Sequence, residues 1–175
     1  GGHGIKRIIG VDRLDYTKGL PQKFRAFGRF LEVCPENRKG FVLTQIAAPS
    51  RESLEAYDDI RKQLESLSGA INGTFGDLDW VPIHYINRTA PRDELAAIYR
   101  SSAIALVTPL RDGMNLVAKE YVAAQNPEDP GVLILSRFAG AAERMADALI
   151  VNPYNIEEIA EAIQRATTMP LDERK

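Results

Sequence analysis

The 175-residue sequence contains only one cysteine, Cys34, and only two histidines. A single cysteine cannot form a disulfide within the chain, so the sequence suits a reducing compartment. We expect Cys34 to be a small apolar side chain buried at the end of a helix. Histidine and cysteine are too scarce for a typical transition-metal site, so no metal is expected.

Long apolar runs and a strong net charge are also lacking. No run approaches the roughly 20 residues that a membrane-spanning helix needs, and no signal-peptide pattern is present. We therefore expect a cytoplasmic protein without a membrane partner. The formal net charge is only −2, so no overall positive field would attract nucleic acid. Any phosphate site must then be built locally, from a few cations and backbone amides.

Several well-known nucleotide and hydrolase motifs are absent as well. The glycine-rich dinucleotide fingerprint does not follow the first apolar run, which argues against a NAD site, and there is no P-loop. Asp12 and Asp15 are three residues apart, which is the wrong spacing for haloacid-dehalogenase phosphatases. No nucleophile elbow is found. We expect no cofactor.

What the sequence does contain is a regular alternation of short apolar runs and helix-period segments. The runs lie at residues 7–11, 40–46, 80–86, 103–107, 131–135 and 148–151. They are nearly continuous, as is typical of strands buried on both faces. The helix-period segments lie at residues 20–34, 50–67, 91–101, 115–125 and 155–167. This order predicts an α/β fold with a doubly wound, mostly parallel sheet and helices on both faces.

The chain length suits one domain. Residues 1–4 are glycine-rich and are interpreted as a remnant or loose linker, so the predicted domain is 5–175. Residues 69–79 contain three glycines and are predicted to form a surface loop after the second helix.

The loop at residues 12–19 is the first place to look for a binding site, because ligands of such sheets bind beyond the carboxyl ends of the strands. Arg13 and Lys18 would lie there, where a guanidinium fork and an ammonium could bind a diphosphate. The alternative is an ordinary charged turn, in which Asp12 and Asp15 pair with these cations at the surface.

A second loop, residues 108–120, also leads from a strand into a helix. The backbone amides of residues 114–117 would be helix N-terminal donors suited to an anion. Asp112 could accept hydrogen bonds from sugar hydroxyls, and Glu120 from ribose hydroxyls. The alternative is that Asp112 only caps the helix and Glu120 is solvated. A third loop, residues 136–143, is explained mostly by close packing of small side chains.

Three stretches match a known family. They are Val-Asp-Arg-Leu-Asp-Tyr-Thr-Lys-Gly at 11–19, residues 108–125 and Asn-Pro-Tyr at 152–154. The most specific string is Arg-Asp-Gly-Met-Asn-Leu-Val-Ala-Lys-Glu-Tyr at 111–121, within the second stretch. In these stretches, and over nearly all of its length after residue 4, the chain resembles the retaining trehalose-6-phosphate synthases. Those enzymes pair two Rossmann-like domains in the GT-B arrangement. The resemblance implies that residues 5–175 are the carboxy-terminal, donor-binding domain.

The resemblance also implies a set of site residues. Arg13 and Lys18 would bind the donor diphosphate, and together with Asp112 they are the implied catalytic residues. The other implied donor contacts are Ala90 near the base, Gly113, Met114 and Asn115 at the glucose, Leu116 and Val117 at the nucleotide, and Glu120 at the ribose. Arg51 would reach the phosphate of the acceptor. Ala90 is smaller than the residue that some relatives carry there.

The implied reaction transfers glucose from UDP-glucose to glucose 6-phosphate with retention and without a metal, giving trehalose 6-phosphate. Fixed cations and helix amides would stabilise the charge that the departing diphosphate gains in the transition state. The family's acceptor contacts come mainly from its amino-terminal domain, so the isolated chain is expected to bind the donor with negligible turnover. Two alternatives are an inert sugar-nucleotide-binding regulatory domain and a related transferase that uses another nucleotide sugar. A homo-oligomer is a further expectation for the full-length protein.

Overall fold

The computed structural model describes residues 4–49, 54–112, 115–140, 142 and 147–174. A six-stranded sheet in the order β3-β2-β1-β4-β5-β6 forms the centre, and every neighbouring pair of these strands is parallel. The strands are β1 (Lys6–Arg13), β2 (Phe41–Ala48), β3 (Ile83–Ile86), β4 (Ile104–Val107), β5 (Val132–Ser136) and β6 (Leu149–Val151). The predicted doubly wound α/β fold is confirmed.

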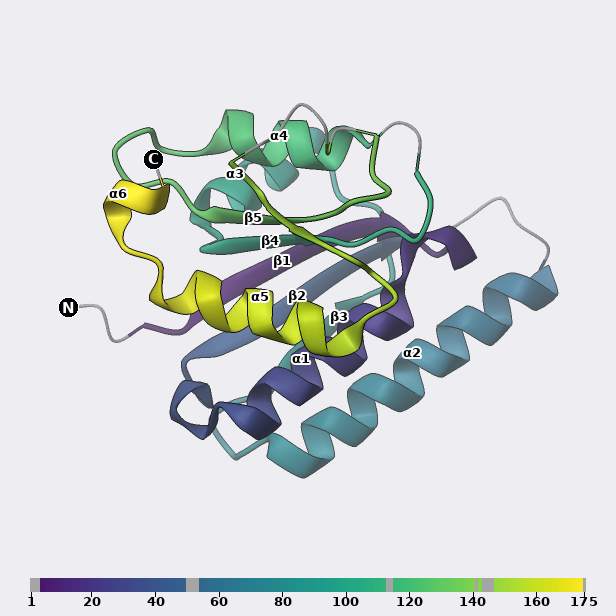
Figure 1. Cartoon of the computed structure of the whole chain (residues 1–175). Coiled ribbons are helices and arrows are strands. Elements are labelled where there is room, and N and C mark those ends of the chain that lie inside the picture. The colour runs from purple at the N-terminus through teal and green to yellow at the C-terminus, as the bar shows by residue number, and fades with distance from the viewer. Residues whose placement is uncertain (1–3, 50–53, 113–114, 141, 143–146, 175) are drawn as a thin grey trace.

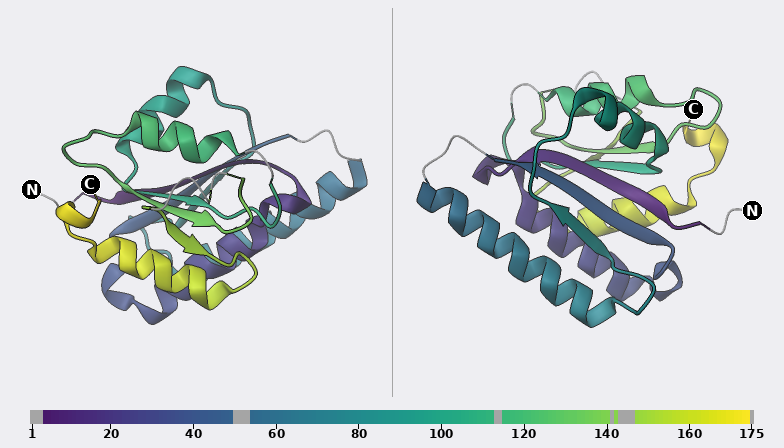
Figure 2. Two further views of the ribbon diagram at one scale, coloured as in Figure 1. Left: turned by 45° about the horizontal axis from the view of Figure 1, so that its top comes forward. Right: turned by 180° about the vertical axis from the view of Figure 1, so that it is seen from behind.

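Helices cover both faces of this sheet, which makes three layers (Figure 1). The helices are α1 (Leu20–Val33), α2 (Leu54–Phe75), α3 (Arg92–Ser101), α4 (Leu116–Ala124), α5 (Ile156–Thr168) and α6 (Leu171–Arg174). Short 3-10 turns lie at η1 (Tyr16–Lys18) and η2 (Pro35–Asn37). Helices α1, α2 and α5 lie on one face, and α3 and α4 lie on the other, as the views from two further directions confirm (Figure 2).

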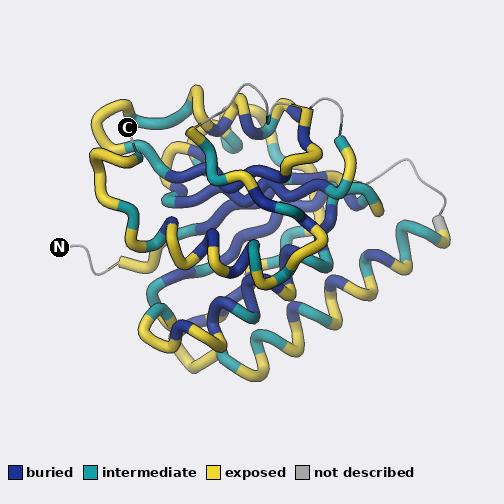
Figure 3. Tube along the Cα trace, in the orientation of Figure 1, coloured by how far each residue is buried: buried dark blue, intermediate teal, exposed yellow. Residues whose placement is uncertain are grey.

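Each face of the sheet has its own apolar core. Ile8 belongs to the cluster under α1, α2 and α5, whereas its neighbour Ile9 belongs to the cluster under α3 and α4. Successive strand residues point to opposite faces, so both must be apolar. This explains the nearly continuous apolar runs, and the central strands are accordingly the most buried part of the chain (Figure 3).

Helix α1 shows why the segment after β1 is helical. Leu20, Phe24, Phe27, Phe30 and Leu31 recur at helical spacing, and all five are fully buried against the sheet and its neighbouring helices. The helix ends at Val33, and Cys34 follows it as the buried C-cap, as the sequence predicted.

Helix α2 corrects the prediction for the following segment. The sequence suggested a helix ending at residue 67 and a loop over 69–79, but the helix continues to Phe75. Gly69 and Gly73 lie within it with open space around them. Each glycine costs about 1 kcal/mol relative to alanine in a helix interior, and the packing of Leu67, Ile71 and Phe75 against the core offsets that cost.

No helix in the described part of the chain is long and apolar enough to cross a bilayer.

Candidate functional site

The loop that follows β1 folds into a short turn held by its own side chains. The Asp15 carboxylate accepts hydrogen bonds from the backbone N–H of Thr17 and from its hydroxyl, both at 2.9 Å, and so caps the 3-10 turn η1. Gly19 then adopts a left-handed conformation with φ of 66°. A glycine is favoured there because a Cβ would be strained at this φ and would lie 2.5 Å from the carbonyl oxygen of Thr108.

The loops after β1 and β4 are joined by their backbones. The carbonyl of Thr17 accepts hydrogen bonds from the N–H groups of Leu110 at 2.7 Å and Arg111 at 3.2 Å. The β1 and β4 strands are neighbours in the sheet, so their carboxyl ends meet at the same edge. The two loops that the sequence indicated as places for a binding site therefore lie side by side at this edge.

The loop after β5 holds Asp112 from the other side. The Asp112 N–H donates to the carbonyl of Phe138 at 3.3 Å, and the Gly140 N–H donates to the carbonyl of Asp112 at 2.7 Å. The sequence attributed this third loop mostly to close packing of small side chains. The structure adds a specific role, because these backbone bonds fix the main chain at Asp112.

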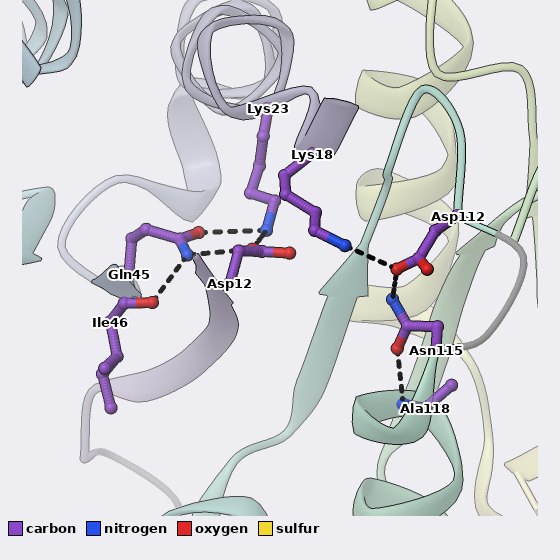
Figure 4. A network of polar contacts seen from close by, with 8 residues as sticks. All are labelled: Asp12, Lys18, Lys23, Gln45, Ile46, Asp112, Asn115 and Ala118. Atoms are coloured by element: carbon purple, nitrogen blue, oxygen red, sulfur yellow. Dashed lines mark hydrogen bonds and ion pairs between the residues drawn. The ribbon is translucent and has the colours of Figure 1, made fainter. Parts of the chain in front are cut away.

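Lys18 and Asp112 meet across the gap between the first two loops (Figure 4). The Lys18 ammonium lies 2.7 Å from Oδ2 of Asp112, and both side chains are 12% exposed. The Asn115 side-chain amide donates to the same oxygen at 3.0 Å, while its carbonyl oxygen accepts from the Ala118 N–H and caps α4.

Two details of the alternatives that the sequence left open differ from these contacts. The alternative interpretation paired Lys18 with acidic residues of its own turn, but it pairs with Asp112 instead. The suggested role of Asp112 as the cap of α4 is also wrong, because Asn115 is the cap.

A cleft of about 380 Å³ opens between these loops and the start of α3. It is lined by Val11, Asp12, Arg13, Lys18, Ile46, Ala48, Thr89, Ala90, Leu95, Asp112, Asn115, Leu116 and Val117. The residues predicted from sequence that meet here are Arg13, Lys18, Ala90, Asp112, Asn115, Leu116 and Val117. Helix α4 begins at Leu116, so its first amides have no partner within the helix. The Ala118 amide is taken by the Asn115 cap, which leaves those of Leu116 and Val117 as the candidates for an anion.

Glu120 does not line this cleft. It lies one turn along α4 in a neighbouring hollow of about 410 Å³ between α3 and α4, and Leu95 borders both spaces. The Tyr99 hydroxyl in this hollow is buried without a hydrogen-bond partner among the described residues. Burial, with a smaller contribution from Glu120, raises the pKa of Tyr99, so the phenol keeps its proton. The predicted residues Arg51, Gly113 and Met114 lie outside the described residues.

The sequence argument missed an aromatic hollow beside the cleft. This hollow of about 610 Å³ shares Asp112 with the cleft and includes three exposed aromatic side chains, Tyr16, Phe138 and Tyr154. The rings of Phe138 and Tyr154 meet edge to face at 6.0 Å. Each aromatic lies just beyond the carboxyl end of a strand, and that position is the signal that could have found them.

Another hollow, of about 340 Å³, lies at the amino ends of the strands near Lys6 and Arg100. Open α/β sheets bind ligands at the carboxyl ends of their strands, so we assign the candidate site to the cleft at Arg13, Lys18 and Asp112. Within the described residues, no three His, Cys, Asp or Glu side chains are grouped so as to hold a metal ion.

The sequence matches the family model for glycosyltransferase family 20 over residues 2–175. The chain belongs to glycosyltransferase family 20. Trehalose-6-phosphate synthases are among its relatives, which confirms the predicted resemblance.

Over the aligned residues, relatives in this family are more than half identical to the chain. It is 54% identical to trehalose-6-phosphate synthase of Enterobacter sp. (strain 638) and 55% identical to that of Klebsiella pneumoniae, in each case over 97% of this chain. It covers only 36% of each of these relatives, so it spans about a third of their length.

Solved family members have the same fold. An alpha,alpha-trehalose-phosphate synthase (UDP-forming) from Burkholderia xenovorans, in complex with glucose-6-phosphate, is 58% identical and superposes with a TM-score of 0.96 over 99% of this chain and 38% of that one. A structure from E. coli with UDP-2-fluoro glucose bound is 54% identical, with a TM-score of 0.96 over 99% of this chain and 38% of that one.

Proposed function

We propose that the cleft binds UDP-glucose and that residues 5–175 are the donor-binding domain of a UDP-forming trehalose-6-phosphate synthase. The observation that carries the proposal is the meeting of Arg13, Lys18 and the start of α4 in one cleft at the carboxyl edge of the sheet. Two side-chain cations and the N-terminal amides of a helix are the groups that bind a diphosphate. The related structures with a UDP-glucose analogue and with glucose-6-phosphate bound support this assignment.

In the proposed reaction, glucose passes from UDP-glucose to glucose 6-phosphate and the diphosphate leaves as UDP. Arg13 is exposed, and Lys18 is within reach of the same space, so both can contact the phosphate oxygens. Charge that develops on the leaving group would be stabilised by groups that are already in place. No residue of the cleft is required as a nucleophile, since the leaving phosphate can itself accept the proton of the acceptor hydroxyl on the same face of the sugar.

The ion pair between Lys18 and Asp112 suits this role. An incoming diphosphate offers Lys18 an acceptor of higher charge than a carboxylate, so the ammonium can exchange one for the other. Asp112 would then accept hydrogen bonds from hydroxyls of the donor glucose, and it lies at the boundary with the aromatic hollow. Apolar faces of sugars pack well against aromatic rings, so we place the acceptor side of the reaction in that hollow. Arg51, outside the described residues, stays a predicted contact to the acceptor phosphate.

The nucleoside end of the donor would extend along α3 and α4. Ala90 and Thr89 border the cleft near Leu95, and Glu120 lies just beyond Leu95. Leu95 lines both spaces, so we expect the ribose to lie over it, between the diphosphate and Glu120. A cytoplasmic location, where UDP-glucose is available, belongs to the same proposal.

Titration of the chain with UDP, UDP-glucose, GDP, ADP and uridine tests the proposal, with heat-stabilisation as a second readout. We expect UDP and UDP-glucose to bind in preference to the other nucleotides. Arg13→Ala should weaken UDP binding by about 1–3 kcal/mol, the scale of a hydrogen bond to a charged group, and should leave uridine binding unchanged. Arg25→Ala, an exposed arginine on α1, is the matched control.

Three outcomes would overturn parts of the proposal. Equal UDP affinity in Arg13→Ala and the control would remove Arg13 from the site. A preference for GDP or ADP would favour a related transferase with another nucleotide sugar. A longer protein that contains this chain, binds UDP-glucose and transfers no glucose would favour an inert regulatory domain.

A further inference from the structure

The charged side chains that line the cleft cancel one another. The described lining residues include two cations, Arg13 and Lys18, and two carboxylates, Asp12 and Asp112. Their formal charges sum to zero, although the proposed ligand is a diphosphate. Beyond the amides at the start of α4, a further cation close behind the lining would make this part of the cleft attractive to the ligand.

Lys23 is that cation. Its ammonium lies 2.8 Å from Oδ2 of Asp12, and their side chains are 0% and 3% exposed respectively. Gln45 closes a triangle, since its amide donates to the same carboxylate oxygen at 3.0 Å and its carbonyl oxygen accepts from Lys23 at 3.0 Å (Figure 4). Gln45 also donates to the backbone carbonyl of Ile46 at 3.1 Å, which ties the triangle to β2.

The position of Lys23 is costly for a structural residue. Burying an ammonium and a carboxylate removes both from water, at several kcal/mol per ion, and an apolar pair of similar volume is often at least as stable. Lys23 is also the fourth residue of α1, and a cation near the N-terminus of a helix opposes the helix dipole. Stability alone therefore gives little reason for a lysine here.

The strand beneath the triangle is shaped to admit it. Gly10 pairs with Gln45 in the register of β1 and β2. A Cβ at Gly10 would collide with the side-chain oxygen of Gln45 and would lie 2.7 Å from the Lys23 ammonium. The lack of a side chain at Gly10 leaves the room in which the charges of Asp12 and Lys23 can meet.

We propose that Lys23 is a positioning residue of the donor site, which neutralises Asp12 and holds its carboxylate against α1. The cleft then keeps a surplus of one positive charge for the diphosphate. The inference rests on the proposed function, since it assumes a phosphate-bearing ligand. Lys23 is fully buried and acts through Asp12, not by contact with the ligand.

Three variants test the proposal by their effect on UDP and uridine affinity. Lys23→Met leaves the charge of Asp12 unopposed, so UDP binding should weaken about tenfold, the scale of one unit charge acting across a partly solvated cleft. Uridine has no phosphate and should bind as in the wild type. Asp12→Asn should bind UDP as tightly as the wild type or more tightly. The double variant Asp12→Asn/Lys23→Met removes both charges and should recover most of the UDP affinity.

Lys62→Met, an exposed lysine on α2, is the control for a lost surface charge. If Lys23→Met does not fold, Asp12→Asn and the double variant still decide the question. A purely structural triangle predicts that both of them lose UDP and uridine affinity together.

The outcomes separate this inference from the proposed function. Wild-type chain that binds neither UDP nor pyrophosphate would overturn both. Wild-type binding combined with unchanged UDP affinity in Lys23→Met, or with equal losses for UDP and uridine, would overturn the role of Lys23 alone. Weaker UDP binding by Asp12→Asn would do the same.

Discussion

Asp12 and Asp112 invite comparison, because each lies at or beyond the carboxyl end of a parallel strand, pairs with a lysine and lines the same cleft. The pair of Asp12 with Lys23 is closed, with side chains 3% and 0% exposed and Gln45 bonded to both. The pair of Asp112 with Lys18 is at the rim, with both side chains 12% exposed. The same two residue types thus serve in one fixed pair and one accessible pair.

The difference in burial decides what each pair can do. A ligand cannot reach the ammonium of Lys23, so that pair can only set the charge and geometry of the cleft. Lys18 and Asp112 are open to the cleft, and each can exchange its partner for part of a ligand. Under the proposed function, burial therefore separates a charge that would prepare the site from charges that would act on the ligand.

The largest expected effect is on stability. If it is not observed, the distinction between the buried pair and the accessible pair is wrong. Lys23→Met should lower the free energy of unfolding by about 3–5 kcal/mol, the cost of leaving one partner of a buried pair alone. Lys18→Met should lower it by only about 1 kcal/mol, because the pair is accessible to water, and Asn115 still donates to Asp112. Urea unfolding of both variants measures the difference, and equal losses would show that burial does not distinguish the pairs.

The next effect concerns Gly19. It lies between Lys18 of the accessible pair and helix α1, which carries Lys23 of the buried pair. Gly19→Ala should cost about 2 kcal/mol of stability, because alanine is strained in the left-handed region and its Cβ would press on the carbonyl of Thr108. UDP affinity should fall with it, since Lys18 is the adjacent residue. Gly69→Ala is the control, because that helical glycine has open space around it, and it should be neutral or stabilise by up to about 1 kcal/mol. Thermal unfolding with and without UDP compares the two variants. A Gly19→Ala variant as stable as the wild type would contradict the close approach of the loops.

A smaller effect separates capping from ligand binding. Asn115 and Asn155 cap α4 and α5 in the same way, each accepting from the N–H three residues on. Replacing either by alanine should cost about 1 kcal/mol of stability. Only Asn115→Ala should also weaken UDP-glucose binding, because Asn115 bonds Asp112 and Asn155 does not. Calorimetric titration measures UDP-glucose binding by both variants. An equal loss of affinity in the two would contradict a role for Asn115 in the donor site.

The smallest effect lies away from the cleft, at Tyr85. It changes how stability depends on alkaline pH, and it must be known before the pH dependence of the two pairs is measured. Burial raises the pKa of Tyr85 on β3 to about 12 from the ordinary value of 10.0. The folded chain therefore holds this proton more tightly than the unfolded chain does. Its stabilising contribution is complete below pH 10 and is lost as the pH rises toward about 12.

Tyr85→Phe should remove part of this alkaline loss. At neutral pH it should change stability by less than about 0.5 kcal/mol, because the hydroxyl has no hydrogen-bond partner among the described residues. Urea unfolding between neutral pH and pH 12 measures both effects. An alkaline stability curve identical to that of the wild type would show that Tyr85 does not contribute.

Much of the fold could be predicted because both faces of the sheet are covered. Apolar residues such as Ile8 and Ile9 must then alternate sides without polar interruption, which marks the strands. The extent of α2 could not be predicted, because Gly69 and Gly73 resemble a loop locally and only packing by residues such as Ile71 shows otherwise.

The candidate site, like the fold, could be predicted from the sequence only in part. The meeting of Arg13 with the start of α4 follows from a general rule for parallel sheets, so the loops could be named from sequence. The partner of Lys18 could not, since Asp112 is 94 residues away. Lys23 was missed because a lysine in the first turns of a helix is normally exposed. Its burial depends on Gly10 and on Gln45 of the neighbouring strand, which no local pattern connects.

The carbonyl of Thr17, which accepts from both Leu110 and Arg111, makes the cleft a property of two distant parts of the chain. Arg13 and Lys18 come from the part before β2, and Asp112 and Asn115 come from the part after β4. Neither part contains a complete site, so the site forms only when β1 and β4 pair in the sheet. UDP bound in this cleft would therefore hold the two halves of the polypeptide together, and by mass action it would favour their reunion if the chain were divided between them.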